Sequence, residues 1–193
     1  MPSRIRISLL FLALCACTQA RSGSRPDPHA SDPAVYRAVL DSISVPQARR
    51  RPTQLVVVDS TFTVQAHDLE IEKVPEVDKA TLSSFQERNK ESRSVRYLST
   101  LNLPVAVVVV SRGTLDSFLH NGPDAYWEEF YRRYPGSNGS FLFSSIGYSA
   151  DGNLAILVLE HGCGGLCGEI SNVVVKRELG RWRVTLIQIK IVS

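Results

Sequence analysis

The sequence predicts an α+β fold, in which N-terminal helices pack on a mainly antiparallel sheet that ends in a four-strand meander. Before residue 139, apolar residues recur every three or four positions in several segments, which is the period of an amphipathic helix. After that point they recur in short runs with period two, and turn residues separate the runs. The chain has 193 residues, enough for one hydrophobic core, and we expect a single domain over residues 35–193.

Residues 1–20 have the composition of a bacterial export signal. Arg4 and Arg6 precede an apolar run at 7–16, which is too short to span a bilayer as a helix. The run leads into Leu14-Cys15-Ala16-Cys17, which resembles a lipobox, and the resemblance implies that Cys17 becomes a lipidated N-terminus. A soluble secreted or periplasmic product, cut after Ala20, is the alternative.

The segment that follows the leader is predicted to be a tether. Residues 21–34 are rich in Ser, Pro, Gly and charge, a composition that buries too little apolar surface to order itself.

The formal net charge of +3 falls to +1 once the two leader arginines are removed. A nearly neutral domain gives no support to nucleic-acid binding, which needs a basic face that neutralises several phosphates, so we expect no nucleic-acid partner. We expect the bacterial cell envelope as the location, with the membrane as a partner through the lipid anchor.

Two amphipathic helices are predicted in the first half of the domain. Asp32 has the residue type of an N-cap and Pro33 that of a first helical position, and the apolar periodicity after them continues to about Ile43. Asp78 is predicted to cap a second, more polar helix that ends near Ser92.

Strands and a further helix are predicted between and after these two helices. The β-branched segment 55–64 indicates a strand or strand pair, and the continuous apolar run 105–110 indicates a central strand covered on both faces. Segment 124–134 predicts a helix with an aromatic stripe, which we interpret as core packing rather than a cofactor site. The four strands of the meander are expected at 141–149, 154–160, 170–178 and 182–192, with a loop at 161–168.

The most distinctive motif lies in that loop, where Cys163 and Cys167 are separated by three residues. Exported proteins fold in an oxidising compartment, so the pair is predicted to form a disulfide, worth only about 2 kcal/mol because the loop is short. Glu160, His161 and Glu169 flank the cysteines and make this loop the candidate site.

Three chemical alternatives remain open for the loop. They are a redox-active dithiol, a cysteine nucleophile with a histidine base, and a metal site in which His161 and both cysteines are joined by a flanking glutamate. We predict no metal site, because one Cys-x3-Cys pair with a single histidine is a weak ligand set without a second cluster.

The stretch from Phe143 to Val184 resembles the C-terminal half of a group of bacterial exported proteins and lipoproteins with no assigned activity. The resemblance covers about 50 residues and rests on the Cys-Gly-x-x-Cys-Gly loop at 163–168 and the Gly-x-Trp ending at 180–182. It implies an envelope location and the fold of the meander, and it implies no activity.

The sequence contains no Gly-x-Ser-x-Gly, His-Glu-x-x-His or phosphate-loop motif, so no residue is predicted to be catalytic and no cofactor is expected. We therefore expect a lipid-anchored, non-catalytic domain that binds a protein or small-molecule partner. The alternative is a redox or metal-dependent enzyme that uses the loop of His161, Cys163 and Cys167.

Overall fold

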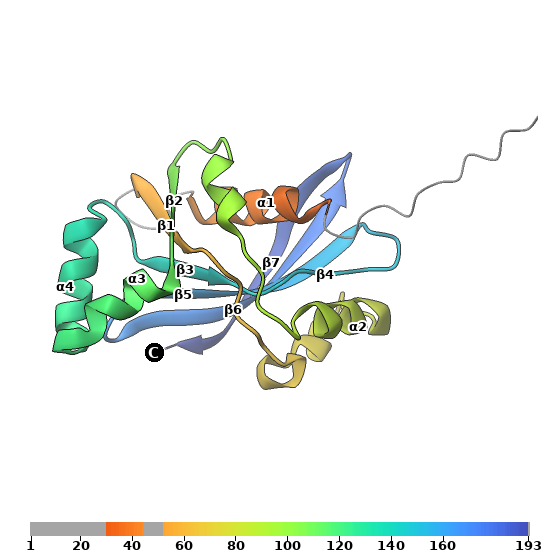
Figure 1. Ribbon diagram of the computed structural model, residues 1–193. Helices are drawn as coiled ribbons and strands as arrows, with labels where there is room; N and C mark the ends of the chain where they lie inside the picture. The colour runs from red at the N-terminus through yellow and green to blue at the C-terminus, as the bar shows by residue number, and fades with distance from the viewer. Residues whose placement is uncertain (1–29, 45–51, 193) are drawn as a thin grey trace, which may run out of the picture.

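The computed structural model describes residues 30–44 and 52–192 (Figure 1). The predicted leader with Cys17 and the first part of the predicted tether lie outside the described residues. Within the described ranges, no helix is both long enough and apolar enough to cross a membrane.

Seven strands form one mixed sheet, which confirms the predicted α+β class. The strand order is β2-β1-β3-β5-β6-β7, and the short β4 pairs with β5 beside β3. β1 runs parallel to both β2 and β3, whereas the remaining pairs are antiparallel. The strands are β1 Gln54–Val58, β2 Ala106–Val110, β3 Ser140–Phe143, β4 Gly147–Tyr148, β5 Leu154–Gly164, β6 Cys167–Glu178 and β7 Arg181–Val192.

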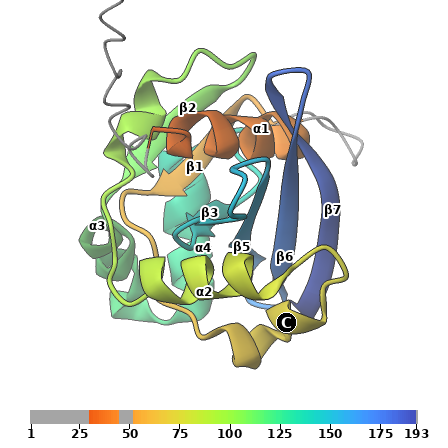
Figure 2. The same cartoon turned by 90° about the vertical axis from the view of Figure 1, so that its right-hand side faces the viewer.

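Helices cover both faces of this sheet (Figures 1 and 2). α1 lies on one face, and α2 and α4 lie on the other, α2 towards β4 and α4 towards the opposite end of β5. The α-helices are α1 Asp32–Ser44, α2 Lys79–Arg88, α3 Arg112–Asp116 and α4 Pro123–Arg133. The 3-10 helices are η1 Ala66–Leu69, η2 Ile71–Lys73, η3 Arg96–Thr100 and η4 Ser117–Asn121.

Alternation along the strands divides the core between the two faces. Leu55 and Val57 of β1 pack with α1, whereas Val56 and Val58 pack with α4. These four residues are all buried, so β1 is a strand covered on both sides. Phe130 and Tyr134 of the predicted aromatic stripe are buried in the core, and its other members, Tyr126, Trp127 and Tyr131, are partly buried against it.

The prediction of a central strand at 105–110 is wrong. Among the described strands, β2 lies at the edge of the sheet and pairs only with β1, and its residue Ala106 is exposed. An apolar, β-branched run indicates that a segment is suited to a sheet, but it does not encode which neighbours the strand has. The interior strand on this side of the sheet is β1, which lies between β2 and β3.

The predicted meander is present, with two differences in its strands. Its first strand is interrupted after Phe143, so that β3 and β4 pair separately with β5. The predicted loop at 161–168 is mostly strand, because β5 continues to Gly164 and β6 begins at Cys167. The last turn is as predicted, with Leu179 and Gly180 at φ of 49° and 79°, the left-handed values that a tight hairpin needs.

Of the two predicted helices, α2 begins where the sequence predicts, and α1 begins one residue earlier. Asp78 caps α2 as predicted, since its carboxylate accepts a hydrogen bond of 2.7 Å from the backbone N–H of Thr81. α1 begins at Asp32, so residues 32–34 of the predicted tether are helical. Asp32 is the first residue of the helix and not the N-cap before it. The carbonyl of Ser31 accepts the first helical hydrogen bond, from the N–H of Val35, and the carboxylate of Asp32 is used elsewhere.

Candidate functional site

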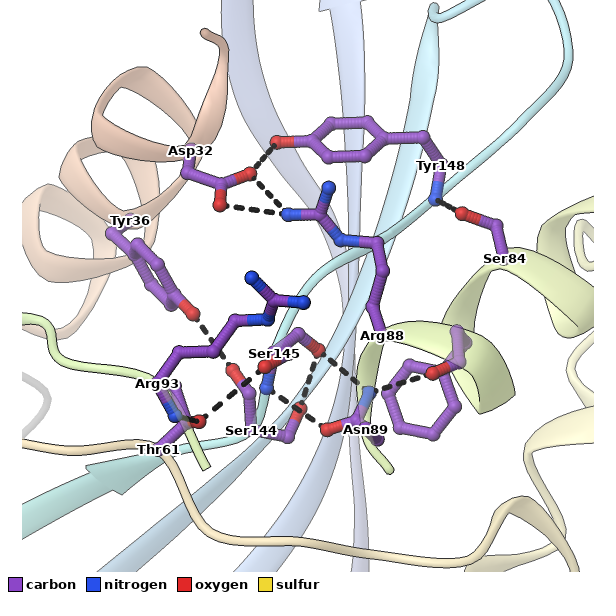
Figure 3. Close-up of polar contacts among 11 residues, drawn as sticks. Asp32, Tyr36, Thr61, Ser84, Arg88, Asn89, Arg93, Ser144, Ser145 and Tyr148 are labelled. Carbon is purple, nitrogen blue, oxygen red and sulfur yellow. Dashed lines mark hydrogen bonds and ion pairs between the residues drawn. The ribbon is translucent and has the colours of Figure 1, made fainter. Parts of the chain in front are cut away.

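The candidate site lies at the break between β3 and β4. Ser145 leaves the strand ladder there, and its backbone groups bond instead to the Asn89 side chain, with distances of 2.9 Å from its N–H and 3.0 Å to its carbonyl (Figure 3). The hydroxyl of Tyr36 donates to the carbonyl of Ser144 at 2.8 Å. Side chains from α1 and from the end of α2 therefore satisfy buried backbone groups that the sheet leaves unpaired.

A buried ion pair lies beside this break. Arg88 at the end of α2 donates to both carboxylate oxygens of Asp32, at 2.8 Å and 2.7 Å, and the exposed fractions of the two side chains are 9% and 14%. The hydroxyl of Tyr148 on β4 donates to the same carboxylate at 2.8 Å. The guanidinium also lies 5.2 Å from the centre of the Tyr148 ring. Asp32 thus connects α1, α2 and β4 (Figure 3).

A cavity of about 410 Å³ opens next to the ion pair. Arg93 lies at this cavity, and its backbone is fixed by Thr61, whose Oγ1 accepts from the Arg93 N–H at 2.9 Å. The Arg93 guanidinium makes no ion pair or hydrogen bond with any other residue in the described part of the chain. The lining residues are Asp32, Pro33, Tyr36, Thr61, Arg93, Ser94, Val95, Tyr97 and Ser145.

The tyrosines around the cavity remain protonated. Burial raises the pKa of Tyr36 well above its ordinary value. Burial and then the Asp32 charge raise the pKa of Tyr97 and of Tyr148 as well. These hydroxyls are therefore neutral hydrogen-bond donors at any physiological pH. Because those of Tyr36 and Tyr148 already have acceptors, the Tyr97 hydroxyl is the one that can donate to a ligand.

The structure brings the two predicted loop cysteines together. The sulfur atoms of Cys163 and Cys167 lie at disulfide distance, with Cα atoms 5.0 Å apart, at the tip of the β5–β6 hairpin. Leu166 in the turn is almost fully exposed. The hydroxyl of Tyr131 on α4 donates to the carbonyl of Cys163 at 2.8 Å, so this tip is also held against α4.

The three residues flanking the cysteines do not form one site. Glu160 and His161 are consecutive on β5 and point to opposite faces of the sheet. The ring of His161 stacks on that of Phe141, with centroids 4.5 Å apart, and its Nε2 lies 2.7 Å from the carbonyl oxygen of Asn138. Glu169 is the cross-strand neighbour of His161. Across the described ranges, no three His, Cys, Asp or Glu side chains are grouped so that they could hold a metal ion.

Most residues of the cavity, and of the ion pair beside it, carry no recognisable signal in the sequence. Asp32 was interpreted only as a helix cap, and Arg88, Arg93, Tyr97 and Tyr148 were not singled out. They come from segments up to 116 residues apart in the chain, and no spacing or motif connects them. The one available signal was the pair Ser144-Ser145, which places two small polar residues inside an otherwise apolar strand pattern.

Comparison with protein-family models gives no match for this chain, and comparisons with curated proteins and with solved structures give none either.

Proposed function

We propose that the chain is an exported protein of the bacterial envelope, anchored by a lipid on Cys17, and that its domain is a non-catalytic binding module for a small organic anion. The observation that carries the binding proposal is that the Arg93 guanidinium, at a preformed cavity, has no ion-pair or hydrogen-bond partner among the described residues. The leader composition, the lipobox-like Leu14-Cys15-Ala16-Cys17 and the cysteine pair at disulfide distance support the location.

The groups that a ligand can reach in this cavity are mainly hydrogen-bond donors. Arg93 offers a planar guanidinium, which matches a carboxylate in two parallel hydrogen bonds, and Tyr97 offers a neutral hydroxyl. Asp32, the one carboxylate among the described lining residues, already accepts from Arg88 and Tyr148. The donor set therefore favours an anion over a cation.

The remaining lining residues define the rest of the ligand. Pro33 and Val95 are apolar, and the ring of Tyr36 adds an aromatic surface. The volume of about 410 Å³ lies at the lower end of the range for small-molecule sites. A compact carboxylate with an apolar body fits these properties. Among the described residues, the lining includes no histidine or cysteine and its tyrosines stay protonated, which favours binding over acid–base or nucleophilic catalysis.

Isothermal titration of the mature domain with benzoate tests this proposal, with succinate and inorganic phosphate as further probes. We expect benzoate to bind and Arg93→Gln to weaken its binding about tenfold or more. Arg96→Gln is the matched control, because it removes the same charge three residues further along the chain. The Arg96 side chain pairs with Asp59, and neither residue is among the described residues that line the cavity. Binding of none of the three anions, or equal losses in the two variants, would overturn the proposal.

A further inference from the structure

A second cavity, of about 310 Å³, lies between the sheet and the helices α3 and α4. Its floor is formed by neighbouring positions of β3 and β5, where Leu142 pairs with Glu160 and Ser140 with Gly162. Leu115, Leu119, Tyr126 and Trp127 provide apolar and aromatic walls. In the described part of the chain, this cavity shares no lining residue with the first one, and it contains Glu160 from the cysteine loop motif.

The aromatic wall of this cavity is held in place by its neighbours. The rings of Tyr126 and Trp127 meet edge to face with centroids 4.9 Å apart, and Trp127 also packs on Phe130. The Trp127 ring lies so close to Gly162 that a Cβ there would be 3.4 Å from it. Trp127 therefore presents a fixed aromatic surface, and tryptophan is the side chain with the strongest attraction for a cation over its ring.

The charged groups of the cavity are two carboxylates and one guanidinium. Glu160 is partly buried in the floor, while Asp116 and Arg112 are exposed on α3. Within the described ranges, none of the three makes an ion pair or a side-chain hydrogen bond. Asp116 lines the same cavity as Tyr126, and its charge adds to the rise in the Tyr126 pKa that burial causes. The net charge is negative, and a partly buried carboxylate without a partner favours a cationic ligand.

We propose that this cavity binds a small organic cation with an apolar body, such as an aromatic or quaternary amine, with its ammonium group between Glu160 and the ring of Trp127. Glu160 supplies the charge, Trp127 the cation–π contact, and Leu115 and Leu142 the contact for the apolar body. The site is separate from the anion site under Arg93, and it does not depend on that proposal.

Titration with benzyltrimethylammonium tests the cation site. The chain has two tryptophans, and Trp182 lies beside Tyr148 rather than at this cavity, so Trp182→Phe gives a protein whose tryptophan fluorescence reports Trp127 alone. We expect saturable quenching in this background, and binding about tenfold weaker or worse after Glu160→Gln. Calorimetry on the otherwise unchanged chain gives the same affinities without relying on the tryptophan substitution.

Glu169→Gln is the matched control, since it removes the same charge from β6 on the opposite face of the sheet from Glu160. Its affinity for benzyltrimethylammonium is expected to stay within about twofold of the unchanged chain. Benzyl alcohol, which has the same ring without the charge, is expected to bind at least about tenfold more weakly. The proposal is overturned if the amine does not bind at about 10 mM, if Glu160→Gln leaves its affinity unchanged, or if benzyl alcohol binds equally well.

Discussion

Asp32 is the residue on which three elements of this fold converge. Its carboxylate accepts hydrogen bonds from Arg88 on α2 and from Tyr148 on β4, although it belongs to the first turn of α1. A buried ion pair of this kind contributes little net stability when intact, because both charges lose their hydration. Removal of one partner is costly, because the other charge is then left buried without compensation.

We predict that Arg88→Met destabilises the domain by about 3–5 kcal/mol. The measurement is the free energy of unfolding from urea titration followed by circular dichroism. The paired change Asp32→Asn with Arg88→Met is expected to recover much of the loss, because no charge remains buried. Arg96→Met is the control, since its ion pair with Asp59 is exposed on the arginine side and is worth at most about 1 kcal/mol. A cost for Arg88→Met as small as that of the control would contradict the prediction.

At the scale of elements, the short strand β4 shows how closely α2 approaches the sheet. A Cβ added to Gly147 would lie 2.5 Å from the Cβ of Phe85 and 2.7 Å from its backbone nitrogen. Phe85 is fully buried and belongs to the core beneath α2. The position of α2 therefore depends on residue 147 being a glycine, which has no side chain. The positions of Arg88 and Asn89 at the end of α2 depend on it in turn.

Gly147→Ala is predicted to destabilise the domain by about 1–3 kcal/mol, because α2 must shift away from β4 to admit the methyl group. Thermal unfolding measured by calorimetry gives the difference. Gly113→Ala provides the comparison, since a Cβ at that position in α3 meets nothing within 4 Å. That substitution is expected to be neutral or slightly stabilising, as alanine favours a helix. Equal effects at the two glycines would show that the close contact at Gly147 is unimportant.

Elements with a regular period were predictable from the sequence, whereas their neighbours and the candidate site were not. The period-two pattern after residue 139 identified the meander, and Asp78 identified the start of α2. The apolar run at 105–110 predicted a strand correctly but placed it at the centre, because composition indicates that a segment suits a sheet and not which place it takes there. Long-range hydrogen bonds such as those of Asn89 with Ser145 leave no local pattern, so the cavity beside them could not be derived.

For the whole molecule, exposed carboxylates with lowered pKa values determine the response to acid. Hydrogen bonds from Lys73 and then Lys190 lower the pKa of Glu70 from 4.5 to about 2, which ties η1 and η2 to β7. Hydrogen bonds from Ser149 and Asn153 lower the pKa of Asp151 to about 2 as well. In both cases the folded state binds the proton less readily than the unfolded state does. Their contribution to stability is therefore complete above the unfolded pKa and is lost as the pH falls towards 2.

We predict that the urea midpoint of the domain falls progressively from about pH 4.5 to about pH 2, and that Glu70→Gln makes this fall shallower. The variant and the unchanged chain should approach each other as the pH falls towards 2, where Glu70 becomes protonated in the folded as well as the unfolded state of the unchanged chain. Midpoints determined at several pH values across this window provide the measurement. An identical pH dependence in the two proteins would show that Glu70 has the same pKa in the folded and unfolded states.

The topology of the sheet also implies an order of assembly. β5, β6 and β7 are joined by tight turns and pair with their neighbours in sequence, so bringing them together closes only short loops. β1 must find β2 and β3 across long intervening segments, and both pairings are parallel. We therefore expect the hairpins to form early and to serve as the template on which the parallel half, and with it both cavities, is completed last.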